Sequence, residues 1–121
     1  MNNSTALIID DEADICFLLG NVLKQKNYEV INSNTLKEGK QKLSTLKPGL
    51  LFLDVNLPDG SSLGELKTIR KNFPHLKIII MSADDGTAEK NIAIASGADL
   101  FLSKPLSQES IEISIEQLFD K

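Results

Sequence analysis

Apolar residues along the chain follow two alternating patterns. Short, mainly apolar runs occur at 5–9, 28–31, 50–53, 76–81 and 100–102. After each run, apolar residues recur every three or four positions, as at Ile15, Leu18, Leu19, Val22 and Leu23. A continuous apolar run is typical of a strand buried on both faces, whereas the wider spacing is typical of an amphipathic helix. The sequence therefore predicts five strands that alternate with five helices.

The predicted helices end at residues that interrupt helical structure. The first should end near Asn27, and the apolar residues of the other four fall within 36–46, 63–69, 88–95 and 111–118. Pro48 and Pro74 break the chain after the second and third helices, and Gly97 is a suitable C-cap for the fourth. Apolar strands alternating with helices indicate an α/β fold, in which a doubly wound parallel sheet is covered on both faces.

Length and composition fit one domain over residues 1–121. The chain has 121 residues, of which 41% are hydrophobic, which is enough to close a single core. No apolar run approaches the ~20 residues that span a bilayer, and the polar start lacks the features of a signal peptide. We therefore expect a cytoplasmic protein that does not interact with membranes.

Charge and cysteine content argue against two other kinds of site. The net charge is −4 and the 13 basic residues are scattered, so direct binding to nucleic acid is not expected. The single cysteine, Cys16, has no Lys, Arg or His nearby in sequence to activate its thiol. We expect Cys16 to be a packing residue.

The chemistry-bearing residues follow the predicted strands. The first strand runs into Asp10-Asp11, the third into Asp54, the fourth into Ser82, and Lys104 follows the fifth. In open α/β sheets, ligands bind beyond the carboxyl ends of the strands. The sequence therefore predicts a site at this edge that contains three carboxylates, a hydroxyl and an ammonium group.

Three carboxylates in one site favour a bound cation. At a separation of ~5 Å they would repel by roughly 3 kcal/mol per pair with an effective dielectric constant of about 20. Oxygen ligands suit Mg²⁺, or Mn²⁺, better than zinc, for which the chain offers one Cys and one His. Such a cation, with Lys104 and Ser82, would stabilise a phosphoryl group moving onto Asp54, whose carboxylate is the nucleophile.

The chain resembles the receiver domain of two-component response regulators, with a chemotaxis-Y-like arrangement of motifs. The residues that carry the resemblance occur in the family's order and spacing: Asp10-Asp11, Asp54-Val55-Asn56-Leu57-Pro58, Ser82-Ala83 and Lys104-Pro105. The resemblance covers essentially the whole chain. It implies a flavodoxin-like sheet with strand order 2-1-3-4-5.

The resemblance also implies a role for individual residues. Asp54 would be the phosphoacceptor, and Asp10, Asp11 and the backbone carbonyl of Asn56 would bind Mg²⁺ with it. Lys104 would contact the phosphoryl group. The peptide bond before Pro105 would be cis.

Three further roles follow from the same resemblance. Ser82 would be the switch hydroxyl, moving together with Phe101. Asn56 and Asp84 flank the site and would tune the rate of dephosphorylation.

Two positions depart from the family pattern. Phe101 stands where many relatives carry the switch tyrosine. The hydrogen bond that a tyrosine hydroxyl would make is therefore absent, and the inward position of the ring is favoured. Ser62 stands where the family usually has glycine. Gly60 is the nearby residue expected to absorb the turn.

The expected function is a phosphorylation-dependent signalling switch, not an enzyme beyond its own phosphorylation and autodephosphorylation. Its partners would be a sensor histidine kinase or phosphotransfer protein and a downstream protein or output domain. The output surface would be the fourth helix, fifth strand and fifth helix, with a phosphorylation-dependent homodimer as one outcome. The alternative is a receiver-like interaction module that works without phosphorylation. A flavin mononucleotide binder and a haloacid-dehalogenase-like phosphatase fit the motifs less well.

Overall fold

A computed structural model describes residues 2–84 and 86–119. Its strands are β1 (Asn2–Ile9), β2 (Glu29–Ser33), β3 (Pro48–Asp54), β4 (Asn56–Leu57), β5 (Gly60–Ser61), β6 (Lys77–Ser82) and β7 (Leu100–Ser103). Its α-helices are α1 (Ala13–Gln25), α2 (Leu36–Leu46), α3 (Leu66–Asn72), α4 (Thr87–Ala95) and α5 (Gln108–Phe119), and a 3-10 helix η1 (Leu63–Glu65) precedes α3. In this part of the chain, no helix is long and apolar enough to cross a bilayer.

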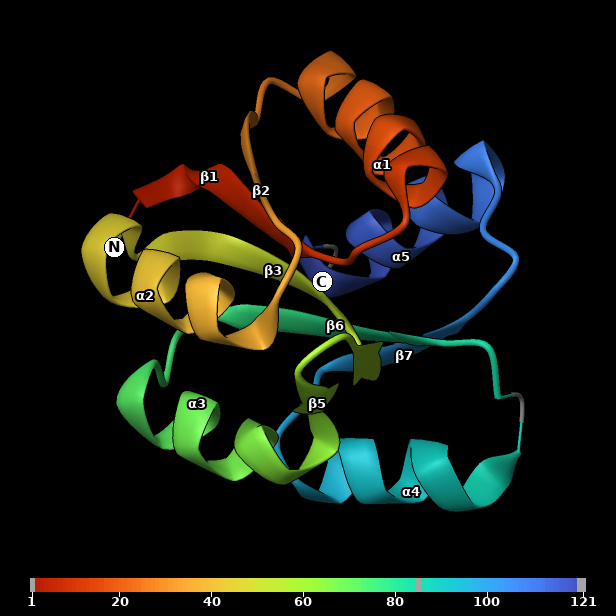
Figure 1. The fold of residues 1–121 in the computed structure, drawn as a ribbon. Helices are drawn as coiled ribbons and strands as arrows, with labels where there is room; N and C mark the ends of the chain where they lie inside the picture. Colours follow the sequence, from red (N-terminus) through yellow and green to blue (C-terminus); the bar gives the residue numbers. More distant parts are fainter. Residues whose placement is uncertain (1, 85, 120–121) are drawn as a thin grey trace.

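The central sheet confirms the predicted fold class. Within the described residues, its five strands are parallel and lie in the order β2-β1-β3-β6-β7. These are the five predicted strands in the predicted order 2-1-3-4-5. Figure 1 shows α1 and α5 on one face of the sheet and α2, α3 and α4 on the other. The fold is therefore a doubly wound α/β sheet.

The core has two layers because the side chains of a buried strand alternate between the faces of the sheet. Every residue of β3 is buried. Leu50 and Phe52 belong to the apolar cluster beneath α1 and α5, whereas Leu51 and Leu53 belong to the cluster beneath α2, α3 and α4. This double burial explains the continuous apolar run in the sequence.

The loop after β3 contains structure that the apolar pattern does not predict. Strands β4 and β5 form a two-stranded antiparallel hairpin, and η1 follows it. Gly60 lies in this hairpin with φ +137°, a region that favours glycine. Ser62 has φ −83° and ψ −11°, which any residue adopts. Gly60 therefore makes the turn, as expected, and Ser62 is accommodated without strain.

Arg70 ties α3 to the chain between α4 and β7. Its Nε and Nη2 atoms donate to the carbonyl of Gly97 at 3.0 and 2.8 Å, and Nη1 donates to Leu76 O at 2.6 Å. Nη2 also lies 2.8 Å from Asp99 Oδ2. A Cβ on Gly97 would lie 2.8 Å from Arg70 Cβ, so the close approach requires glycine.

Arg70→Ala is expected to lower the free energy of unfolding by about 2 to 4 kcal/mol, because several partly buried carbonyl groups lose a charged donor. Urea unfolding monitored by circular dichroism measures this effect. Lys71→Ala changes the neighbouring exposed cation and is the matched control. Equal losses in the two variants would contradict the assigned role of Arg70.

Candidate functional site

The predicted site residues converge at one edge of the sheet because parallel strands end on the same side. Asp10 follows β1, Asp54 ends β3, Ser82 ends β6 and Lys104 follows β7. The Lys104 Nζ atom lies 3.1 Å from Asp10 Oδ2 and 3.4 Å from Asp54 Oδ1. Asp10 is fully buried and Asp54 is 5% exposed. An ion-pair cluster therefore connects the first, third and fifth predicted strands.

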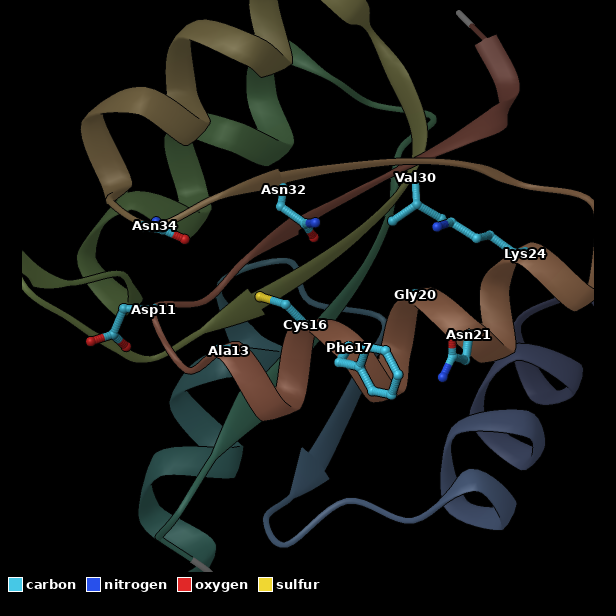
Figure 2. A pocket seen from close by; sticks show the side chains of 10 residues that line it. All are labelled: Asp11, Ala13, Cys16, Phe17, Gly20, Asn21, Lys24, Val30, Asn32 and Asn34. Atoms are coloured by element: carbon cyan, nitrogen blue, oxygen red, sulfur yellow. The ribbon is translucent and has the colours of Figure 1, made fainter.

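The third carboxylate in the cluster belongs to Glu12, not to Asp11. Carboxylate oxygens of Asp10, Glu12 and Asp54 lie within 4.8 Å of one another, and Glu12 Oε1 lies 2.6 Å from Lys104 Nζ. Asp11 is exposed, at one end of a pocket between α1 and β2 (Figure 2). In the turn after β1 the Glu12 N–H donates to Asp10 Oδ1 at 2.9 Å, which holds the Glu12 main chain beside Asp10 while its carboxylate pairs with Lys104. The structure therefore brings together Asp10, Asp54 and Lys104 of the predicted set, and leaves Asp11 outside.

Burial and like charge make the two central carboxyl groups weaker acids. Burial, followed by the charge of Asp10, raises the pKa of Asp54 from 3.8 to about 6, although Lys104 opposes this shift. Burial also raises the pKa of Asp10, against the Glu12 N–H and Lys104. Burial alone would lower the pKa of Lys104, but Glu12 and Asp10 outweigh it and the pKa rises. Lys104 therefore stays positively charged between carboxylates that repel one another.

The residues present fit a hard divalent cation. With all groups ionised, the three carboxylates and Lys104 carry a net charge of about −2, which one Mg²⁺ would neutralise. Asp10 Oδ2 is buried and has no hydrogen-bond partner among the described residues, although it is paired in charge with Lys104. Asn56 begins β4 two residues after Asp54, so that its backbone belongs to the same edge.

Ser82 is hydrogen-bonded away from Asp54. Its hydroxyl donates to the carboxylate of Glu89 in the first turn of α4, and it accepts the Asp84 N–H at 3.0 Å. Asp84 is exposed, and its Oδ1 accepts the Gly86 N–H at 2.8 Å. The switch hydroxyl predicted from the sequence is thus held by α4 in this conformation.

Two other predicted features lie on the β7 side. Phe101 is partly buried and packs against the core cluster beneath α2, α3 and α4. The Lys104–Pro105 peptide bond is cis, the isomer that the sequence resemblance implies. The ring of Phe101 is thus partly buried in this conformation, and its role as a switch residue stays a prediction.

Cys16 is the packing residue that the sequence suggests. It is partly buried and packs against the cluster beneath α1 and α5. Its thiol donates to the carbonyl of Asp10 at 3.4 Å. Burial, and then the charge of Asp10, raises the pKa of this thiol, which disfavours the reactive thiolate.

Sequence reasoning missed Glu12 and Glu89 as members of the site. Glu12 could have been considered from the run Asp10-Asp11-Glu12, which offers three carboxylates after one strand. Which of them pairs with Lys104 depends on the conformation of the loop. Glu89 lies seven residues after Ser82, across the loop that leads into α4, and no periodicity marks it.

Comparison with known proteins agrees with this geometry. Residues 6–116 match the response regulator receiver domain. The chain is 30% identical over 116 residues to the alkaline phosphatase synthesis transcriptional regulatory protein PhoP of Bacillus subtilis, covering 96% of this chain and 48% of PhoP. It is 32% identical over 106 residues to the chemotaxis protein CheY of Thermotoga maritima, covering 87% and 88% of the two chains.

A solved structure shows the same fold. The beryllofluoride-activated NtrC4 receiver domain dimer superposes with a TM-score of 0.89 at 30% identity, over 97% of each chain. The chain spans about half the length of the transcriptional regulators that it matches, such as PhoP. It covers most of the Thermotoga CheY, which is of similar size. This chain therefore belongs to the response regulator receiver domain family.

Proposed function

We propose that this chain is a single receiver domain that accepts a phosphoryl group on Asp54 and changes a surface in response. The donor would be a sensor histidine kinase or a phosphotransfer protein. One observation carries the proposal: a nearly buried carboxylate at the end of β3 shares one lysine with a second buried carboxylate. A carboxylate that only capped a strand would gain nothing from that arrangement.

Asp54 is the nucleophile of the proposed reaction. One of its carboxylate oxygens attacks phosphorus, and the bond from phosphorus to the donor nitrogen or oxygen breaks, which leaves an acyl phosphate on Asp54. Because its pKa is about 6, most Asp54 is ionised and nucleophilic at neutral pH. Lys104, 3.4 Å from Asp54 Oδ1, is placed to neutralise charge on the phosphoryl oxygens.

Asp10, Asp54, the Asn56 carbonyl and one further carboxylate would hold Mg²⁺, or Mn²⁺. When bound, this ion neutralises phosphoryl oxygens and relieves the repulsion between the carboxylates. Glu12 is already paired with Lys104 at 2.6 Å, whereas no ion pair of Asp11 is found among the described residues. Asp11 is therefore freer to turn toward a cation, and we keep it as the proposed ligand.

Asp11→Asn is expected to weaken Mg²⁺ binding about tenfold or more, and Glu12→Gln by less, because Glu12 must give up its ion pair with Lys104 to serve as a ligand. Isothermal titration of each variant with MgCl₂ gives the two affinities. A larger loss in Glu12→Gln would instead assign the ligand to the carboxylate that already lies in the cluster.

The conformational response would start at Ser82. To reach a phosphoryl group on Asp54, its hydroxyl must leave the Glu89 carboxylate, which frees the first turn of α4. Phe101 would move with Ser82, and the face of α4, β7 and α5 would change. This face would control a downstream protein or output domain, or form a homodimer on phosphorylation. The beryllofluoride-activated receiver domain of NtrC4 is itself a dimer, which supports the second possibility.

Asn56 and Asp84 are the proposed rate-tuning residues. Both side chains are exposed and both residues border the site, Asn56 in β4 and Asp84 just after β6. Side chains in these positions can obstruct or orient a water molecule that attacks the acyl phosphate. They would therefore set the rate of autodephosphorylation.

The wild-type protein is expected to gain one phosphoryl group from acetyl phosphate in the presence of Mg²⁺, and Asp54→Asn none, because the amide is not a nucleophile. Intact-mass spectrometry with and without EDTA measures the adduct. Asp14→Asn changes an exposed carboxylate in the first turn of α1 and is the control. A folded wild-type protein that forms no adduct would favour a phosphorylation-independent interaction module.

A further inference from the structure

Ser62 contacts the main chain of the proposed phosphoacceptor residue. It is fully buried, and its hydroxyl donates to the main-chain carbonyl of Asp54 at 2.7 Å. The register of β1 with β3 ends at the Ile9–Leu53 pair, one residue before Asp54. The Asp54 carbonyl thus lies beyond the last register pair of that ladder, and a side chain supplies its hydrogen bond.

Ser62 also holds the next carbonyl of the chain. Its own N–H donates to Val55 O at 2.8 Å. One residue therefore fixes two consecutive peptide groups, those that follow Asp54 and Val55. The third carbonyl in the series belongs to Asn56, the proposed backbone ligand of the cation. A glycine or alanine at position 62 keeps the N–H bond but cannot form the hydroxyl bond.

The far end of the same loop is anchored independently. Asp59 accepts the N–H groups of Leu36 and Lys37 at the start of α2, at 2.8 and 3.0 Å. These bonds lower the pKa of Asp59. Because the hairpin tip is held by α2 and its base by Ser62, loss of the Ser62 hydroxyl would loosen the base next to Asp54 without releasing the tip.

We infer that Ser62 is a positioning residue for phosphoryl transfer: through its hydroxyl it fixes the peptide group after Asp54, and so the orientation of the Asp54 carboxylate and of the Asn56 carbonyl. This inference rests on the proposed function of Asp54. It assigns to residue 62 a role that depends on the hydroxyl group and not on filling space alone.

The test compares variants that separate the hydroxyl from the volume of the side chain. Ser62→Ala removes the hydroxyl, and Ser62→Thr and Ser62→Val form a pair of nearly equal shape of which only Thr can donate. Ser61→Ala is the control, because Ser61 is exposed and its hydroxyl accepts the Leu63 N–H instead of contacting Asp54. The free energy of unfolding of each variant is measured first, so that every assay uses folded protein.

Three readouts then report on positioning. In Ser62→Ala, we expect the maximal rate of phosphorylation by acetyl phosphate at saturating Mg²⁺ to fall about tenfold, since small misplacements of reacting groups have effects of this size or larger. We expect Mg²⁺ affinity to fall severalfold. Amide hydrogen exchange at residues 55–57 of the metal-free protein should become faster. Ser62→Thr should retain more of the rate than Ser62→Val.

The outcomes separate this inference from the proposed function. Unchanged rate, Mg²⁺ affinity and amide exchange in folded Ser62→Ala would overturn the role of Ser62, as would equal rates for the Thr and Val variants. If the wild-type protein forms no adduct, the proposed function fails. The Mg²⁺ affinity and amide exchange of Ser62→Ala, which do not require phosphorylation, still decide whether Ser62 fixes the loop.

Discussion

Replacing Asp54 with asparagine is expected to stabilise the metal-free protein by up to about 3 kcal/mol at pH 8, the free energy equivalent of raising the pKa of Asp54 from 3.8 to about 6. Burial is the largest cause of this shift, and the charge of Asp10 adds to it. The substitution removes the ionised form that both causes disfavour. A substitution that abolishes the proposed activity should therefore make the chain more stable.

The sign of the pH dependence follows from the direction of the shift. The folded-state pKa is raised, so between about pH 4 and pH 6 the folded protein binds more protons at Asp54 than the unfolded protein does. The contribution of Asp54 to wild-type stability should therefore fall as pH rises through this window. The excess of the free energy of unfolding of Asp54→Asn over that of the wild type should grow over the same window and level off above about pH 7.

Urea unfolding in EDTA at several pH values between 4 and 8 tests this prediction. Asp14→Asn, which alters an exposed carboxylate in the first turn of α1, controls for the effect of an Asp-to-Asn change in general. Adding Mg²⁺ should stabilise the wild-type protein and have little effect on Asp54→Asn, because a ligand that binds only the folded state stabilises it. If Asp54→Asn is more stable than the wild type by the same amount at every pH, desolvation of the ionised carboxylate is not the cause.

The sheet was predictable because its physical signal is local and repeated. A strand with helices on both faces must be apolar at every position, as 50–53 is, and the following helix must carry an apolar stripe. The carboxyl ends of parallel strands meet at one edge, so the convergence of Asp10, Asp54 and Lys104 followed from the same pattern. The strand order came from the family resemblance.

The loops at that edge were not predictable in the same way. Their conformation depends on individual hydrogen bonds, such as the one from the Glu12 N–H to Asp10 beside the ion pair of Glu12 with Lys104. The hairpin of β4 and β5 has strands of two residues, too short to show any periodicity. The contact between Ser82 and Glu89 forms across a loop and depends on where α4 begins.

Ser62 illustrates how a departure from a family pattern is interpreted differently once the structure is known. In the sequence it stands where relatives usually have glycine, the residue that a tight turn favours. In the structure Gly60 has the positive φ, and Ser62 gains a hydrogen bond to the Asp54 carbonyl. The residue type at position 62 is thus compatible with the loop and adds a contact to it.

Lys104→Met is expected to slow phosphorylation by acetyl phosphate about 100- to 1000-fold at saturating Mg²⁺, the range seen when one preorganised donor to a developing charge is removed. Methionine preserves much of the length and apolar volume of the side chain. It removes the ammonium group that lies 3.4 Å from Asp54 Oδ1 and 3.1 Å from Asp10 Oδ2. Initial rates of adduct formation by intact-mass spectrometry measure the loss.

Two further variants show whether this loss arises from charge at that position. Lys104→Arg keeps the charge but changes its geometry, so its rate should lie between those of the wild type and Lys104→Met. Lys67→Met removes an exposed lysine on α3 for which no ion pair is found among the described residues, and should leave the rate within about twofold of the wild type. A rate for folded Lys104→Met close to that of Lys67→Met would contradict a direct role. The ammonium group would then serve mainly to hold Asp10, Glu12 and Asp54 together in the unphosphorylated protein.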